Sequence, residues 1–226
     1  MNIQYSKKKQ DIKRDPFIEF LLNIKEKATQ HSTIIIAGVA GIILAMFLVM
    51  GYNHMAASSL RKAQKAFGNA MIAYTSSNNQ KAIEALALVT ENHGNTPQAA
   101  YAAYLLGHIL REQDRYDEAI NWFEMAKNKS KGKSFITGGA LEATATCYES
   151  MGELDKAVSY FEKALQEEHY GYRAPALRWK LALINKSLNN HDKAVALCNE
   201  IVSDTSAVEL KQDAENLLIE LNTKKG

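Results

Sequence analysis

The longest apolar stretch of the chain runs from Thr33 to Tyr52 and contains no charged residue. A helix of about 20 residues is roughly 30 Å long, which matches the hydrocarbon thickness of a bilayer. Because lipid offers the backbone no hydrogen-bonding partners, such a run must form a helix that satisfies its own amides and carbonyls. A buried core helix is the alternative, but core helices seldom stay uncharged on every side over this length. The pattern therefore predicts a transmembrane helix over residues 33–52.

The sequence on either side of this run favours an anchor that stays attached over a cleaved leader. A signal peptide has an apolar core of about 7–15 residues behind a short basic lead, whereas this run is longer and follows 32 residues. Met55-Ala56-Ala57 is a poor cleavage site, and the first cysteine, Cys147, lies too far downstream for a lipoprotein. We therefore expect an uncleaved anchor.

Charge is distributed unevenly around the run. Residues 1–32 carry a net charge of +3, residues 33–52 carry none, and the remainder carries −1. Basic residues favour the cytosolic side of a span, and long C-terminal domains cross largely regardless of charge. We expect residues 1–32 in the cytosol and residues 53–226 across the membrane. The basic tail suits an anionic membrane surface, and the near-neutral remainder lacks the basic patch typical of nucleic-acid binding.

A short amphipathic helix is predicted in the tail. Asp15-Pro16 is typical of a helix start, with Asp15 as the cap and proline at the first position. Apolar residues then follow at helical spacing on one face: Phe17, Phe20, Leu21 and Ile24. A stripe directly before an anchor can lie in the membrane interface, or it can pack on the cytosolic surface of a partner protein. Both possibilities remain open on sequence alone.

The region after the anchor repeats itself four times. A charged residue, an alanine and a branched apolar residue follow a polar turn in each copy, at Lys81, Glu118, Lys156 and Lys193. The four alanines are separated by 37, 38 and 37 residues. A fixed period of this size indicates an array of helical hairpins, and four copies exceed the roughly three needed for stability. No proline or glycine interrupts Tyr52 to Phe67, so the anchor helix is expected to continue into the first hairpin.

The second and third copies carry the clearest motif, a small residue in the first helix and an alanine–aromatic–alanine series in the second. The second copy contains Leu106, Gly107, Tyr116, Ala119, Phe123 and Ala126. The third contains Tyr148, Gly152, Ala157, Phe161 and Ala164. These residues resemble the tetratricopeptide repeat. Asp114, Gly152 and Asn189 occupy the turns inside three hairpins, where a residue that tolerates unusual φ is expected.

The resemblance implies an all-α fold in which an N-terminal transmembrane helix is followed by a right-handed superhelical array of about four tetratricopeptide-like hairpins and a C-terminal cap helix. The expected domains are the cytosolic tail 1–32, the anchor 33–52 and the repeat domain 53–226. The expected repeats are approximately 63–96, 100–133, 138–171 and 175–205, and the cap helix is 206–222.

No pattern for catalysis, for a cofactor or for a metal ion is present in the sequence. None of the six histidines has the spacing of a metal-ligand or catalytic motif, and there is no nucleophile motif or glycine-rich loop. Cys147 and Cys198 are widely spaced. The helices expected to carry them are not neighbours in a repeat stack, so we expect both thiols to stay free. An enzyme is not expected, and binding is the expected activity.

In tetratricopeptide arrays the first helix of each hairpin lines the concave face, and this register supplies a candidate protein-binding groove. Aromatic side chains with polar edges are common in binding surfaces, although packing in the core is the alternative for several of these positions. The candidates are Tyr74, Tyr101, Tyr104, His108, Arg111, Glu142 and Trp179.

The amphipathic helix, single anchor and short repeat array together resemble the bacterial single-pass inner-membrane tetratricopeptide proteins that are ancillary to the Sec translocon. The resemblance implies a periplasmic repeat domain that contacts translocon subunits, a membrane-anchored chaperone or secretory chains. A structural scaffold subunit of a cell-envelope complex, without client binding, is the alternative. Binding of unfolded peptide to the groove would distinguish the two.

Overall fold

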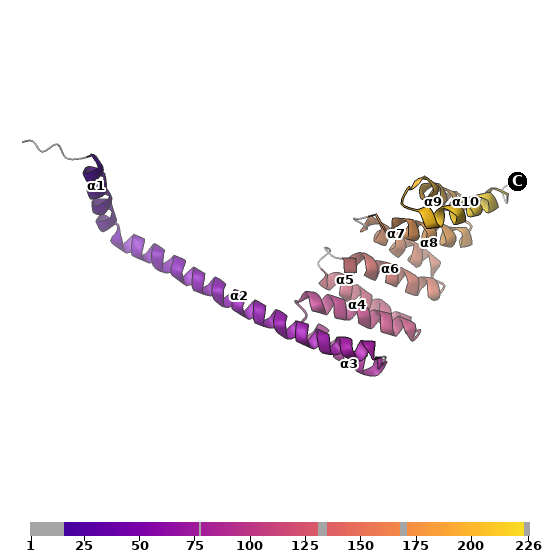
Figure 1. Cartoon of the computed structure of the whole chain (residues 1–226), viewed down its shortest axis with the longest axis horizontal. Helices are drawn as coiled ribbons and strands as arrows, with labels where there is room; N and C mark the ends of the chain where they lie inside the picture. Colours follow the sequence, from indigo (N-terminus) through magenta and orange to yellow (C-terminus); the bar gives the residue numbers. More distant parts are fainter. Residues whose placement is uncertain (1–15, 77, 131–134, 168–170, 224–226) are drawn as a thin grey trace, which may run out of the picture. The chain divides into compact units, whose positions relative to one another are not determined.

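The computed structural model describes residues 16–76, 78–130, 135–167 and 171–223. Every regular element in these ranges is an α-helix (Figure 1). The chain divides into two compact units, Met1–Ala56 and Ala57–Gly226. The expected cap residue Asp15 and the basic stretch before it lie outside the described residues.

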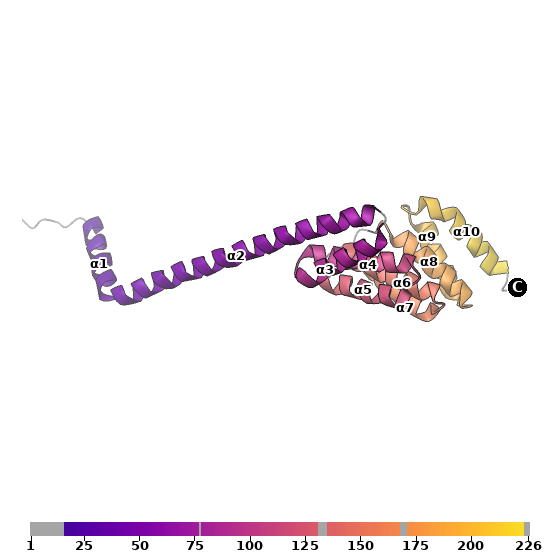
Figure 2. The same ribbon diagram turned by 90° about the horizontal axis from the view of Figure 1, so that it is seen from below.

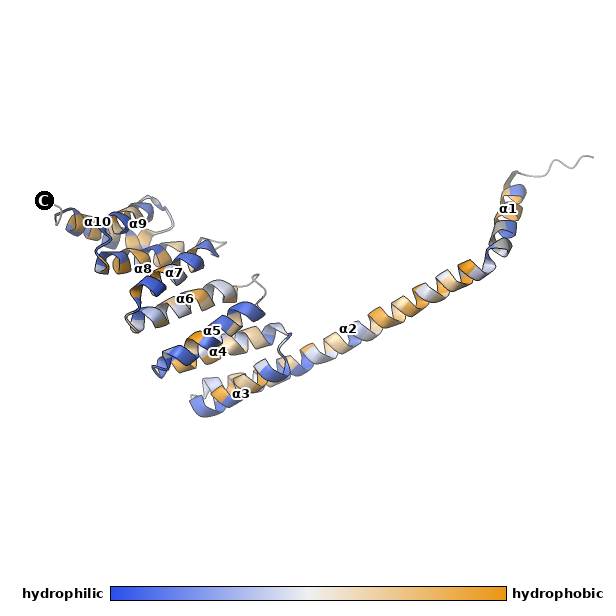
Figure 3. Cartoon of the chain, turned by 180° about the vertical axis from the view of Figure 1, so that it is seen from behind, coloured by the Kyte–Doolittle hydropathy of each residue, from blue (hydrophilic) through white to orange (hydrophobic). Residues whose placement is uncertain are grey.

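The first unit contains α1 (Pro16–Gln30) and the beginning of α2 (Ser32–Thr75), separated by a turn at His31. Among the described helices, α2 alone is long and apolar enough to cross a membrane, and no residue of its apolar stretch is buried. Figure 3 shows this stretch as the hydrophobic part of α2 next to α1. The helix is continuous from Ser32 to Thr75, as predicted from the uninterrupted sequence, and the boundary between the units falls within it.

The second unit begins with the last turns of α2 and continues as a stack of helices (Figure 2). Its other helices are α3 (Asn79–Asn92), α4 (Pro97–Glu112), α5 (Tyr116–Lys129), α6 (Phe135–Ser150), α7 (Leu154–Gln166), α8 (Ala174–Ser187), α9 (His191–Ser203) and α10 (Val208–Thr223).

Three buried clusters form the core of this unit, and successive clusters share a helix, so the core runs along the stack. The four alanines that define the period are fully buried. The side chains four residues after these alanines are also fully buried, and they are Leu86, Phe123, Phe161 and Cys198. The alanine lets neighbouring helices approach closely, and the larger side chain one turn later fills the space between them. This local packing explains why the sequence period is visible.

The turns within three hairpins contain the unusual backbone predicted for them. The φ angle is 58° at Asp114, 76° at Gly152 and 57° at Asn189. A residue with a Cβ pays about 1–2 kcal/mol for this left-handed conformation, and Asp and Asn tolerate it better than most residues. Tyr116 also donates a hydrogen bond of 2.7 Å to Asp114 Oδ1 across its turn. The prediction for these three turns is confirmed.

Substituting Gly152 by alanine should lower the free energy of unfolding by about 1 kcal/mol. A Cβ added at Gly152 would meet no atom within 4 Å, so only the left-handed φ is penalised. The matched control is Gly68→Ala in α2, where space is equally open. Alanine should raise helix stability there by about 0.5–1 kcal/mol. Urea unfolding monitored by tryptophan fluorescence measures both, and an unchanged midpoint for Gly152→Ala would contradict the argument.

Candidate protein-binding face

One side of α4 faces the core and the other presents a line of polar and aromatic side chains. Its core side is formed by small and aliphatic residues, among them Ala99, Ala102, Ala103, Leu106, Gly107, Ile109 and Leu110. The helical period places Tyr101, Tyr104, His108 and Arg111 on the opposite side, one per turn. Four of the predicted site residues therefore share one helix face.

Tyr104 and His108 rest on the core through the ring of Phe123. The ring centroids of Tyr104 and His108 are 4.5 Å apart, and that of Phe123 lies 5.9 Å from Tyr104 and 5.1 Å from His108. Below them, a Cβ added at Gly107 would come within 2.6 Å of Phe123 Cε1. The glycine of the repeat motif thus makes room for the phenylalanine, and the phenylalanine in turn supports the two surface rings.

Burial lowers the pKa of His108 to about 4, and the positive charge of Arg111 acts in the same direction. Burial also raises the pKa of Tyr104, with a further contribution from the carboxylate of Glu142. Both side chains are therefore uncharged at neutral pH. They offer hydrogen-bonding edges and aromatic surface to a partner rather than charge.

The stability of the second unit should fall as pH decreases from about 6.5 to about 4. The unfolded chain protonates His108 near pH 6.5, whereas the folded chain resists protonation down to about pH 4, so the stabilisation is complete only above pH 6.5. Because the ring is only partly buried, we expect the free energy of unfolding to fall by about 1–2 kcal/mol, which is less than the whole pKa shift would imply. His108→Phe keeps an aromatic ring against Phe123 and should flatten this pH dependence. Urea titrations at several pH values measure the free energy of unfolding of both proteins. If this free energy changes with pH equally in the wild type and in the variant, His108 is not the cause of the pH dependence.

Side chains from three successive hairpins meet over the start of α6. A Cβ at Gly139 would lie 2.9 Å from Tyr104 Oη, and one at Gly138 would clash with the guanidinium of Arg173. Arg173 Nη1 donates a 2.8 Å hydrogen bond to Glu142 Oε2. The two glycines therefore allow Tyr104 from one side and Arg173 from the other to approach the α6 backbone, close to Glu142.

Ion pairs connect α6, α8 and α10. Lys180 Nζ of α8 lies 3.6 Å from Glu149 Oε2 of α6. Lys186 Nζ of α8 lies 2.6 Å from Glu220 Oε2 of α10. Each of these partly exposed pairs stabilises the fold by at most about 1 kcal/mol. Their charged groups are already paired within the chain and are less available to a binding partner. Among the described residues, Arg111 forms no ion pair, so its guanidinium remains available.

A hollow of about 230 Å³ opens beside Tyr101 at the beginning of α4. It is lined by Asn95, Thr96, Pro97, Ala100, Tyr101, Lys129, Ser130 and Ile136. Tyr101 is 44% exposed, and its ring centroid lies 6.4 Å from that of Phe67 in α2. Lys129 Nζ donates to the carbonyl of Gly94 at 3.3 Å. The hollow is mostly apolar and large enough for one side chain of a partner.

The two thiols have no chemical role suggested by their surroundings. Cys147 and Cys198 are free, as predicted, and both are fully buried. Burial raises the pKa of Cys147 to about 11 and also raises the pKa of Cys198. A thiol that stays protonated is a poor nucleophile. No cluster of three metal-binding side chains occurs in the part of the chain that the structure describes.

Comparison with protein families decides what this architecture is. The tetratricopeptide repeat family model matches residues 67–133 and 143–208, more than half of the chain. The chain belongs to the tetratricopeptide repeat family. A search of curated protein sequences finds no significant match.

Several solved structures have the same fold. A tetratricopeptide repeat protein from Parabacteroides merdae is similar with a TM-score of 0.59 and 18% identity, over 73% of this chain and 61% of its own. The crystal structure of MamA gives 0.53 and 17%, over 71% and 86% of the two chains. A MamA RS-1 ArsTM double mutant gives 0.51 and 16%, over 67% and 76%. At these identities the likeness concerns the fold alone. Tetratricopeptide repeats generally serve as protein-interaction modules, so protein partners are expected for this chain.

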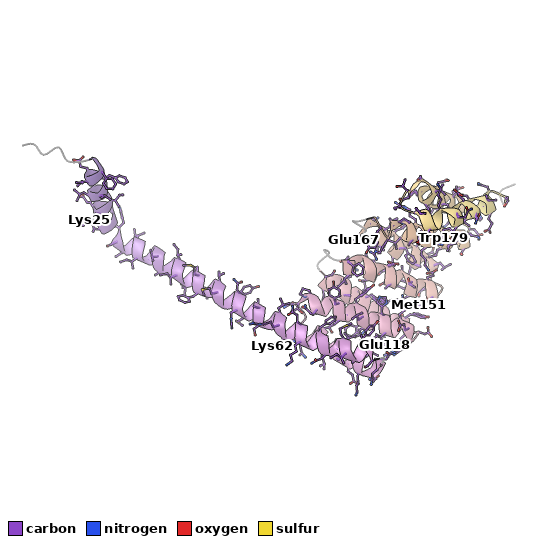
Figure 4. The ribbon with its side chains drawn as sticks, viewed as in Figure 1. Lys25, Lys62, Glu118, Met151, Glu167 and Trp179 are labelled. Atoms are coloured by element: carbon purple, nitrogen blue, oxygen red, sulfur yellow. The ribbon has the colours of Figure 1, made fainter. Side chains whose placement is uncertain are left out.

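The seven predicted site residues of this tetratricopeptide array fall into three groups. Tyr101, Tyr104, His108 and Arg111 share the α4 face, and Glu142 of α6 lies close enough to Tyr104 to raise its pKa. Tyr74 is partly buried against the first core cluster at the end of α2. Trp179, labelled on α8 in Figure 4, packs against the third cluster and does not join the α4 group.

Sequence reasoning missed the aromatic residues around Arg173. The guanidinium carbon of Arg173 lies 5.7 Å from the ring centroid of Phe135 and 5.9 Å from that of Tyr172. Both rings are largely exposed, at 58% and 61%. The paired glycines 138 and 139 were the available signal, because glycine is costly inside a helix and its presence indicates a close approach by other groups.

Proposed function

We propose that this protein is a membrane-anchored interaction module that binds a protein partner on the exposed face of α4. The observation that carries the proposal is the combination of the half-exposed Tyr101 at the hollow, the aromatic pair Tyr104 and His108, and the guanidinium of Arg111, which forms no ion pair with any residue that the structure describes. Exposed aromatic and arginine side chains are the residue types that most often dominate binding energy at interfaces.

The chemistry of this face specifies the kind of segment that would bind. An apolar or aromatic side chain of the partner fits the hollow beside Tyr101, and a carboxylate or a backbone carbonyl suits Arg111. Helices α6 and α8 are less suitable for binding a charged partner, because Glu142, Glu149 and Lys186 are already paired with other side chains.

We infer that residues 33–52 anchor the protein in the inner membrane without cleavage, with residues 1–32 in the cytosol and the repeat domain in the periplasm. The apolar stretch of α2 and the basic lead support this topology. The resemblance to ancillary Sec-translocon subunits suggests translocon subunits, a membrane-anchored chaperone or secretory chains as partners. Confinement to the bilayer would raise the effective concentration of such a partner, so a modest affinity would suffice.

A structural scaffold subunit of an envelope complex is the second candidate, and the ion pairs across α6, α8 and α10 favour it. A face whose charges are already satisfied by its own helices suits one fixed, folded neighbour better than many different unfolded segments. In that case the helix stack would hold a folded subunit and would not bind unfolded clients.

Photo-crosslinking in native membranes tests the binding face. A crosslinking side chain at position 101 should give defined protein adducts, whereas the same group at Leu88 on α3, which is 55% exposed, is the control and should not. Arg111→Ala should weaken the adduct from position 101 about tenfold, as expected for loss of about 1–2 kcal/mol.

The identity of the adduct separates the candidate functions. Translocon subunits, an anchored chaperone or secretory chains would support the first, and a single unrelated envelope subunit would favour the scaffold. Adducts from position 88 but none from position 101 would place the binding site on another face of the stack.

A further inference from the structure

Helix α1 exposes an unusually apolar surface for its size. Six large apolar side chains are between 47% and 65% exposed, and they are Phe17, Ile18, Phe20, Leu21, Leu22 and Ile24. Four of the six, Phe17, Phe20, Leu21 and Ile24, share one face of this 15-residue helix, and an apolar face of this size indicates that a partner or a membrane covers it.

The polar residues of α1 are arranged around this patch in a regular way. Successive side chains of a helix are rotated by about 100° around its axis. This rotation places Phe17, Phe20, Leu21 and Ile24 within roughly 60° of their common mean direction. Lys25 falls about 80° to one side of Phe17 and the register position of Lys27 about 80° to the other. Glu19 and Glu26 lie on the opposite face, about 180–200° from Phe17. The helix thus has an apolar face with a lysine position at each border and carboxylates on the far side. Ile18 and Leu22 lie about 100° and 140° from Phe17, between Lys25 and Glu26, so they are not part of this apolar face.

The position of α1 in the chain brings it close to the anchor. It ends at Gln30, a single turn residue follows, and the uncharged run begins at Thr33. An extended residue spans at most about 3.6 Å, so the end of α1 lies within roughly 10 Å of the first residue of that run. Figures 1 and 2 both show α1 running in a different direction from α2 after the turn at His31.

We propose that α1 lies in the cytosolic interface of the membrane, with Phe17, Phe20 and Ile24 among the acyl chains and Lys25 at the phosphates of anionic lipids. This inference rests on the proposed anchor at residues 33–52. Lysines at both borders of an apolar face can extend to the headgroups while their stems cover apolar surface. The net positive charge of residues 1–32 adds attraction to an anionic leaflet. Lipid is favoured over a protein partner because an apolar face tethered this close to the bilayer surface meets lipid at all times.

Environment-sensitive labels in reconstituted full-length protein test the proposal. Cysteine is introduced singly at Phe20, Ile24, Glu19, Glu26 or Ile43 and labelled with the fluorophore NBD; the two native cysteines are fully buried. The protein is placed in vesicles of phosphatidylcholine with or without phosphatidylglycerol. Labels at positions 20 and 24 should show blue-shifted emission and resist aqueous dithionite, whereas labels at positions 19 and 26 should be quenched at once.

The label at position 43 separates this inference from the proposed anchor. If positions 20 and 24 are quenched as fast as position 19 while position 43 is protected, α1 does not lie in lipid and the anchor stands. If position 43 is quenched as well, the anchor itself is refuted. Protection of positions 20 and 24 in native membranes but not in pure lipid would show that a protein covers α1, which also overturns the proposal.

Two double variants test whether the lysines of α1 are needed for binding to anionic lipid. Lys25→Glu combined with Lys27→Glu should remove most of the protection at position 20 in vesicles containing phosphatidylglycerol. The matched control, Lys62→Glu with Lys65→Glu in α2, should leave it unchanged. Equal protection in both double variants would contradict the role of anionic lipid.

Discussion

Arginine at both Ile42 and Ile43 should release the protein from the membrane. These residues lie at the centre of the uncharged run, and both side chains are exposed on α2. An arginine at the centre of a membrane helix costs about 2.5–3.5 kcal/mol, whereas isoleucine contributes favourably by about 0.5 kcal/mol. The double substitution therefore shifts the insertion free energy by roughly 6–8 kcal/mol. Alkaline extraction of cell membranes should recover the wild type in the membrane pellet and the variant in the soluble fraction.

The control for this experiment moves the same charges beyond the run. Ser58→Arg with Ser59→Arg adds two arginines further along the same helix, outside the run, and should leave the protein in the pellet. A variant at positions 42 and 43 that still resists alkaline extraction would show that another part of the chain holds the protein in the membrane. The interfacial placement proposed for α1 would not produce that result, because alkaline treatment strips peripheral attachments.

Alanine at Phe123 or at Phe161 should each lower the free energy of unfolding by about 3–5 kcal/mol. Both rings are fully buried, and each fills the space one turn after a motif alanine. Loss of a buried aromatic ring combines lost transfer free energy with an unfilled cavity. For Phe123 the loss also removes the support beneath Tyr104 and His108. Met125→Ala on the same helix, where the side chain is 37% exposed, should cost less than about 1 kcal/mol.

Two tryptophans allow this prediction to be followed at separate places in the stack. Trp122 packs against the first core cluster and Trp179 against the third. Urea unfolding of the full-length protein in detergent, with either tryptophan replaced by phenylalanine, reports each region separately. Phe123→Ala should lower the midpoint most strongly at Trp122, because repeats interact mainly with their neighbours. A loss below 1 kcal/mol at either phenylalanine would mean that the ring is not a main element of the core.

The regular features of the fold were readable from sequence because they depend on local rules. A period of 37–38 residues with a buried alanine in each copy specifies one hairpin per copy. The turn residues Asp114, Gly152 and Asn189 were predicted from their tolerance of positive φ, and all three have it. The free thiols followed in the same way from their places in the repeat order.

The candidate site was only partly predictable. Helical register correctly places Tyr101, Tyr104, His108 and Arg111 on one face of α4, since that requires only the period of a single helix. The same register also predicted Trp179 as a residue of the binding groove, although its side chain packs against the third core cluster. Whether a half-buried aromatic faces a partner or a neighbouring helix depends on the next hairpin, which the local pattern does not specify.

The uncharged run, the order of the helices and the positions of the turns follow from the amino-acid sequence alone, because hydrophobic period and backbone preference act over a few residues. Which charged side chains remain unpaired among the described residues depends instead on how the hairpins pack together. Arg173 reaches Glu142 across 31 residues of sequence, over two glycines that leave room for it, while Arg111 remains without an acidic partner among the described residues. Such pairings depend on distances between side chains of different hairpins, and these distances are set only when the stack packs together.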